Sequence, residues 1–240
     1  MNKAKYIMFF ILLCTICGCS TTKETNKLSN INPEDIAISY TNSFEYDGKY
    51  TTREELINAC DLIVYAEITN IEYTVSAYGF CRTNLEIEVI EDLKGTTHSG
   101  NKIRLIKDQG ITTAEQYLNS FPEEMKKEIR KDFSEYSDEE LNSLYIQQME
   151  YGDVMSEIGQ KRIYYLAKSA FYDTDQTYTT ILGPMFDYIE VSEGKFMDTQ
   201  YLGFHLSEPY YLKENSEIVL NADSQFEFTL EEIKEKDGLN

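Results

Sequence analysis

Alternating apolar and polar residues dominate the stretch from Arg82 to Leu93. Apolar residues occupy every second position and polar residues fill the positions between them, which is typical of a strand with one face in the core. A strand pattern at 62–68 comes before this stretch, and its start is apolar on both faces, as in a central buried strand. Two apolar positions follow within 103–105. The pattern therefore predicts a three-stranded antiparallel meander over residues 62–107.

The periodicity then changes to that of helices. Two capping boxes, which begin at Thr113 and Ser137, mark helix starts, and Pro122 stands at a third. Apolar residues recur every three or four positions after each start, in the last helix through about Met149. Residues 112–150 are therefore predicted to be an acidic insert of two or three short helices.

Strand patterns return after this insert. They fall at 154–158, 161–168, 178–182, 188–191 and 195–197. A helix over residues 53–59 is predicted before the meander, and another from the capping box at Thr229 to Gly238. Residues 198–226 show no readable pattern. The predicted fold class is α+β, a mostly antiparallel five-stranded OB-like barrel with an acidic helical insert after the third strand. A β-sandwich is the alternative.

The N-terminal segment has the pattern of an export signal. Lys3 and Lys5 precede an apolar run over 6–16, which is too short to span a bilayer. The run ends at Gly18 and Cys19, an arrangement that resembles the lipobox of bacterial lipoproteins. This resemblance implies a diacylglyceryl group on Cys19, and two acyl chains are enough for stable anchoring. An ordinary secretory signal, cleaved near the same place, is the alternative.

These segments predict the organisation of the whole chain. Residues 1–18 form a signal peptide and residues 19–33 a flexible polar tether. Residues 34–240 form a single globular domain that contains the helical insert.

The charge of the chain limits its partners. Lys and Arg total 22 against 42 Asp and Glu, so the net charge is −20. Nucleic acid is excluded as a partner, because phosphates require basic patches. The negative charge of the domain also repels it from an anionic membrane surface. Cys19 is therefore predicted to be its only contact with the membrane.

Two cysteines follow the leader, Cys60 and Cys81. A hairpin that turns near residue 77 would place Cys81 opposite Tyr73, about 13 residues and roughly 43 Å of strand away from Cys60. A disulfide needs Cα atoms within roughly 7 Å. The sequence therefore predicts two unpaired and mostly buried thiols.

No catalytic, cofactor-binding or metal-binding residue is predicted. The two histidines, His98 and His205, stand in no zinc-binding motif, and neither a nucleophile elbow nor a phosphate-binding glycine loop occurs. A cysteine paired with His205 is a conceivable nucleophile, but a buried structural cysteine is favoured. Aromatic residues crowd the range 164–188, and cross-strand packing is favoured over a ligand platform.

Several strand motifs resemble those of a known group of proteins. They lie at 61–68, 83–95, 100–103 and 159–166. They are similar to uncharacterised exported proteins of Gram-positive bacteria with an OB-like or netrin-module-like barrel. The resemblance implies a fold but no activity.

The resulting hypothesis is a lipoprotein anchored at the extracytoplasmic face of the cell membrane. It would be a non-enzymatic module that binds an unknown protein or small ligand. A cell-envelope hydrolase with dispersed catalytic residues and a structural envelope spacer are the alternatives.

Overall fold

The structure is a computed structural model that describes residues 31, 35–42, 52–169, 177–205 and 226–239. Cys19, the predicted signal peptide and all of the predicted tether except Ile31 lie outside the described residues. The anchor and the domain boundaries therefore stay predictions.

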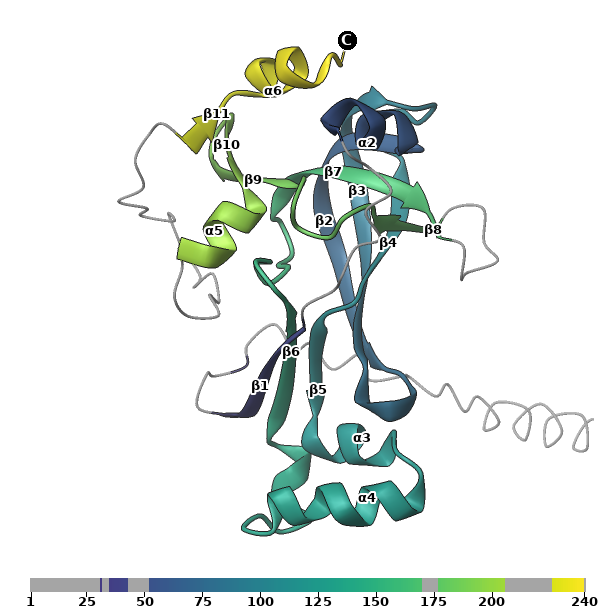
Figure 1. Cartoon of the computed structure of the whole chain (residues 1–240), viewed down its shortest axis with the longest axis vertical. Coiled ribbons are helices and arrows are strands. Elements are labelled where there is room, and N and C mark those ends of the chain that lie inside the picture. Colours follow the sequence, from purple (N-terminus) through teal and green to yellow (C-terminus); the bar gives the residue numbers. More distant parts are fainter. Residues whose placement is uncertain (1–30, 32–34, 43–51, 170–176, 206–225, 240) are drawn as a thin grey trace, which may run out of the picture.

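Five strands form a closed barrel (Figure 1). In order around the barrel they are β7 (Lys161–Lys168), β2 (Leu62–Val75), β3 (Cys81–Lys94), β4 (Lys102–Lys107) and β8 (Thr177–Thr180), and β8 pairs back with β7. Only β4 and β8 run parallel; the other neighbours are antiparallel. A three-stranded meander completed by two later strands is OB-like. The predicted α+β fold class is confirmed.

The barrel is filled by the inward-facing residues of its own strands. Alternate residues of β3 are buried, as the period-two pattern predicted. They pack against apolar side chains from the other strands; the buried cluster is Leu62, Val64, Ala66, Ile68, Leu85, Ile87, Val89, Ile103, Leu105, Tyr164 and Leu166. Each fully buried aliphatic side chain stabilises the fold by about 1.5–3 kcal/mol relative to exposure.

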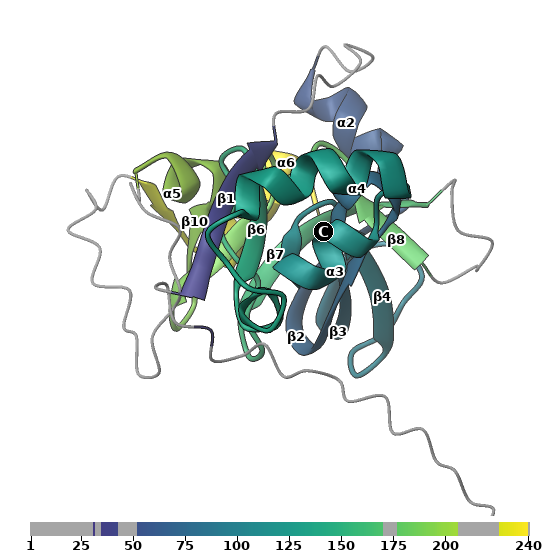
Figure 2. The same cartoon turned by 90° about the horizontal axis from the view of Figure 1, so that it is seen from below.

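The segment between β4 and β7 contains helices and strands. Its elements are β5 (Gly110–Thr113), α3 (Ala114–Asn119), α4 (Glu123–Ile129), the 3₁₀ turns η4 (Arg130–Phe133) and η5 (Glu140–Asn142), and β6 (Tyr145–Glu150). Thr113 accepts a hydrogen bond from the Gln116 amide and so begins α3 as predicted. α3 and α4 lie at one end of the molecule (Figures 1 and 2).

The predicted helix through about Met149 is wrong, because its second half is the strand β6. β6 is the middle strand of a second sheet, parallel to β1 (Ile36–Asn42) and antiparallel to β5. Five of its six residues are buried, including Gln147 and Gln148. Apolar spacing along the sequence resembled a helix, but the strand forms because two distant segments supply hydrogen bonds on both of its edges.

Two further predictions need correction. Residues 154–158 form a connection and not a strand, because the backbone carbonyls of Val154 and Met155 accept hydrogen bonds from Arg162 in place of a ladder partner. The β2–β3 hairpin is also shifted by two residues, so Cys81 lies opposite Val75. A 3₁₀ turn, η3 (Ala77–Gly79), forms the tip and tightens the connection.

An extension of the main sheet continues from β7. It consists of β9 (Tyr188–Ser192), β10 (Lys195–Asp198) and β11 (Glu227–Phe228), with α5 (Thr199–His205) after β10. The strands predicted at 188–191 and 195–197 are confirmed. The last helix, α6 (Leu230–Asp237), begins with the predicted capping box at Thr229 and ends at Gly238, whose φ of 63° favours glycine.

An ion pair attaches the terminal helix to the barrel. Arg53, at the start of α2 (Arg53–Ala59), donates to both carboxylate oxygens of Asp237. The Tyr165 hydroxyl donates to the same carboxylate, and the Arg53 guanidinium lies 5.1–5.9 Å from three aromatic ring centroids, Tyr165, Phe186 and Tyr188. These members of the aromatic group therefore serve packing, as the sequence favoured.

Lys94 lies at the C-terminal end of α2. The last turn of this helix has no basic residue of its own. Its ammonium group, at the end of β3, donates to the carbonyls of Ile57, Asn58 and Cys60 at 2.6, 3.2 and 2.7 Å. A cation at this end satisfies the last carbonyls and opposes the helix dipole. Lys94 thus ties the C-terminal end of α2 to the end of β3 in the barrel.

Replacing Lys94 with methionine keeps the aliphatic stem but removes all three hydrogen bonds. We expect Lys94→Met to lower the free energy of unfolding by about 1.5–3 kcal/mol, as for bonds to a charged donor. Urea denaturation measures this change. Lys161→Met, which breaks a looser pair at 3.7 Å with Glu190, is the control and should cost much less. Equal losses in the two variants would contradict the role of Lys94.

Candidate functional site

The outer face of the barrel has a polar pocket across β2, β3 and β4. Its volume is about 410 Å³, and the inward-facing Leu85 and Ile103 complete its lining. The other lining residues are all polar and come from three neighbouring strands: Asn70 and Glu72 from β2, Asn84 and Glu86 from β3, and Lys102 and Arg104 from β4. Alternation in β3 and β4 turns these side chains outward, opposite to the core.

Charges in this pocket balance. Glu86 accepts a hydrogen bond from Lys102 at 2.6 Å and another from the Thr69 hydroxyl at 3.0 Å. These two bonds hold the pKa of Glu86 below its usual range, so the carboxylate stays ionised. Arg104 lies opposite Glu86 in the strand register and is exposed. With Glu72, the pocket has two carboxylates, two cations and two amides, and thus both donors and acceptors without net charge.

The tip of the same β2–β3 hairpin exposes two aromatic side chains. Tyr78 and Phe80 are 57% and 56% exposed, among the largest values for apolar side chains in the described ranges. Tyr78 has a φ of 63°, and every other described residue with positive φ is a glycine. A non-glycine residue in this region costs roughly 1–3 kcal/mol, and such strain often marks functional positions.

The surrounding structure fixes this tip. The backbone amide of Tyr78 donates to the carbonyl of Ser120, which follows α3, and the Gln148 side chain of β6 donates to the Gly79 carbonyl. A Cβ at Gly79 would come within 2.5 Å of the Tyr117 ring, so the close contact with α3 requires glycine. The insert therefore holds the backbone of the tip that carries the exposed rings.

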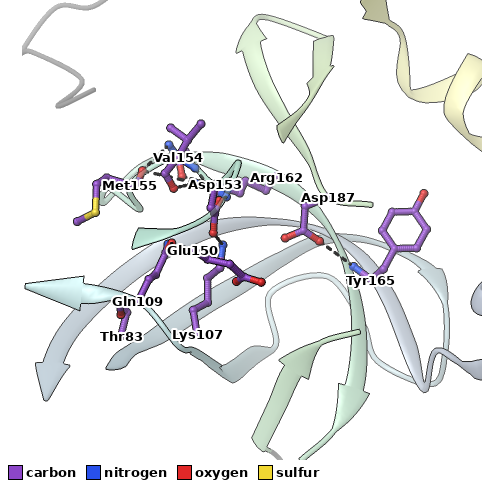
Figure 3. A network of polar contacts seen from close by, with 11 residues as sticks. Thr83, Lys107, Gln109, Glu150, Asp153, Val154, Met155, Arg162, Tyr165 and Asp187 are labelled. Atoms are coloured by element: carbon purple, nitrogen blue, oxygen red, sulfur yellow. Dashed lines mark hydrogen bonds and ion pairs between the residues drawn. The ribbon is translucent and has the colours of Figure 1, made fainter. Parts of the chain in front are cut away.

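Buried charges close the end of the barrel nearest the second sheet (Figure 3). Lys107 of β4 and Arg162 of β7 both form ion pairs with Asp153, and all three side chains are fully buried. Arg162 also donates to Gln160 at 2.6 Å and to the Val154 carbonyl at 2.8 Å. Burial alone would raise the pKa of Asp153, but the two cations outweigh it and hold this pKa below its usual range.

Two cysteines and two histidines are the residues that the sequence offered as candidates for chemistry. Cys60 and Cys81 are free and buried, which confirms the predicted unpaired thiols. His98 is exposed in the turn before β4. His205 is the last residue of α5, and its side chain lies outside the described part. The structure therefore does not test the hypothesis that a cysteine and His205 form a nucleophile pair.

The described residues contain neither a cluster of metal-ligating side chains nor a membrane-spanning helix. Among them, no group of three or more His, Cys, Asp and Glu side chains has the arrangement of a metal site. Within the same ranges, every helix is too short or too polar to cross a bilayer.

The chain matches none of the protein-family models, curated proteins or solved structures with which it was compared. The five-stranded barrel therefore rests on its own geometry.

The pocket and the tip were missed by sequence reasoning, although part of the signal was present. The outward positions of β3, including Asn84 and Glu86, followed from alternation. Register decides which β2 and β4 residues join them, and no local pattern specifies register. The sequence predicted a turn near residue 77, but nothing in it showed that Tyr78 takes a positive φ.

Both thiols should be unreactive in the folded protein. Burial raises the pKa of Cys60 and Cys81 to about 12, so almost no thiolate exists at neutral pH. We expect a thiol-specific disulfide reagent at pH 8 to label neither cysteine in the native chain and to label both after denaturation. Mass spectrometry of the labelled peptides measures this, and rapid labelling of either native thiol would contradict it.

Proposed function

We propose that this chain is a lipoprotein anchored by Cys19 at the extracytoplasmic face of the membrane, where it acts as a non-enzymatic binding module. The polar pocket on β2, β3 and β4 is the observation that supports binding. The lipobox-like sequence supports the anchor. Kinship with exported Gram-positive proteins of OB-like or netrin-module-like fold is part of the same proposal, supported by the strand motifs and the barrel.

The lining of the pocket favours a neutral, polyhydroxylated ligand, that is, a saccharide. Amides, carboxylates and cations together can donate to and accept from several hydroxyl groups at once. A balanced set of charges offers no net attraction to an ion. The volume of the pocket, about 410 Å³, falls within the usual range for small-ligand sites. The same face of OB barrels is a general position for oligosaccharide binding.

The anchor can be tested first. When the full chain is expressed in a bacterial host with a radiolabelled fatty acid, we expect label on the wild type and none on Cys19→Ala. The variant should also leave the membrane fraction, because the acyl chains supply the attachment. Cys14→Ala is the matched control and should keep the label. Label that survives Cys19→Ala, or that is missing from the wild type, would contradict lipidation at this residue.

The pocket is tested with the full chain in detergent on an array of neutral and N-acetylated oligosaccharides. We expect binding by the wild type and a loss of tenfold or more in Asn84→Ala and Arg104→Ala, equivalent to about 1.4 kcal/mol. Arg82→Ala is the matched control, since Arg82 is on the same strand as Asn84 but does not line the pocket. Circular dichroism checks that each variant is folded.

The outcomes of this experiment separate the hypotheses. Binding that depends on Tyr78 and Phe80 but not on Arg104 would move the site to the hairpin tip. Hydrolysis of a bound saccharide would favour the envelope hydrolase. Neither binding nor turnover by the folded wild type would contradict the saccharide site and favour the structural spacer.

A further inference from the structure

Asp187 connects three elements at the point where the extension leaves the barrel. It stands directly before β9, and its carboxylate Oδ1 accepts the backbone amide of Tyr165 in β7 at 3.4 Å. Its backbone carbonyl accepts the amide of Thr199, the first residue of α5, at 2.9 Å. β9 itself pairs with β7 at two positions, and the bond between the Asp187 carboxylate and the Tyr165 amide extends this short ladder.

The other carboxyl oxygen of Asp187 has no hydrogen-bond partner among the residues that the structure describes. Asp187 is 1% exposed, and Oδ2 is buried. In Figure 3 this oxygen points to the side on which Lys107 and Glu150 lie, away from the bond to Tyr165. A buried ionised carboxylate with an unsatisfied oxygen is strongly disfavoured, whereas a protonated carboxyl group avoids the cost of burying the charge.

The charge balance of this region also favours a proton. Two cations, Lys107 and Arg162, face three buried carboxyl groups, Asp153, Glu150 and Asp187. Asp153 forms ion pairs with both cations. One proton on a carboxyl group would neutralise the set, and Asp187, whose Oδ2 has no hydrogen-bond partner among the described residues, is the group to which we assign it.

The groups around Asp187 have opposite effects on its pKa. Burial raises the pKa of Asp187 to about 7; Lys107 and Arg162 act against this shift, and Asp153 adds to it. From β7, the buried Tyr164 hydroxyl also lacks a partner, and its own pKa is raised by burial and by Asp187. Two more partnerless or neutral groups lie nearby, the Thr199 hydroxyl of α5 and the Cys60 thiol after α2.

We propose that Asp187 is a proton-dependent clasp, in which the protonated carboxyl group holds β9, β10 and α5 against the barrel and loss of the proton loosens them. The apolar contacts of Ile189, Met197 and Leu202 with Val154 remain in either state. The extension is therefore loosened and not released. This device is independent of the saccharide site, which lies on other strands of the barrel.

The direction of the pH effect follows from linkage. Asp187 binds its proton more tightly in the closed structure than in an opened one, where an ordinary carboxyl group titrates near 4. The closed structure gains its full stabilisation below that ordinary pKa and loses it as pH rises toward neutrality. The equilibrium constant for opening should therefore rise by up to about tenfold per pH unit between roughly pH 4 and 7, and then level off.

Hydrogen exchange of the full chain between pH 5 and 7.5 tests this, after correction for the intrinsic pH dependence of exchange. In the wild type, we expect protection of amides in β9, β10 and α5 to fall as pH rises, while protection in β3 stays constant. Asp187→Asn is an analogue of the protonated side chain. In this variant, protection of the amides in β9, β10 and α5 should stay high and should not change with pH. Asp108→Asn, an exposed residue on the same domain, is the control and should behave as the wild type.

A second measurement does not depend on any variant. The carboxyl carbon of Asp187, followed by NMR in the ¹³C-labelled wild-type chain, should titrate near neutral pH. A midpoint below pH 5 would overturn the proposal. So would an exchange profile that keeps its slope in a folded Asp187→Asn variant. If that variant fails to fold, the NMR midpoint and the wild-type exchange profile still decide the question.

Discussion

The fold depends on the buried ion pairs of Asp153 with Lys107 and Arg162. At one end of the barrel, the apolar interior is followed by these buried charged side chains, and the second sheet shields them from water. Breaking such a set by removing one partner typically costs about 3–5 kcal/mol, because the remaining charge stays buried. Since Lys107, Asp153 and Arg162 come from β4, the β6–β7 connection and β7, the set also fixes how the inserted segment returns to the barrel.

Closing this end has consequences for the hairpin β2–β3. Its tip extends past the barrel, yet the second sheet and α3 hold it through Gln148 and Ser120. This support stabilises the unfavourable backbone of Tyr78, which an isolated hairpin would relax. The insert, which in sequence looked like an added helical segment, is therefore the support that holds the backbone of the tip.

Local signals predicted the parts of this fold that form locally. Alternation located β3, and capping boxes located the starts of α2, α3 and α6, because each depends on residues a few positions apart. β6 was misread as a helix because its partners, β1 and β5, lie elsewhere in the chain. The strand at 161–168 was predicted, but nothing near Arg162 in sequence indicates that its side chain is buried against the carboxylate of Asp153.

The same difference between local and distant signals explains the candidate sites. The β3 part of the polar pocket could be predicted, since the outward side chains of β3 follow from its period, but the β2 and β4 residues that join them depend on register. Nothing in the sequence around Asp187 indicated a proton site, because its pKa is raised only by burial in the folded chain. The polar pocket is exposed on the barrel surface, while Asp187 is buried where the extension joins the barrel. Ligand binding at β2, β3 and β4 and a pH response at β7 and β9 are thus expected to act on different strands of one sheet and independently of each other.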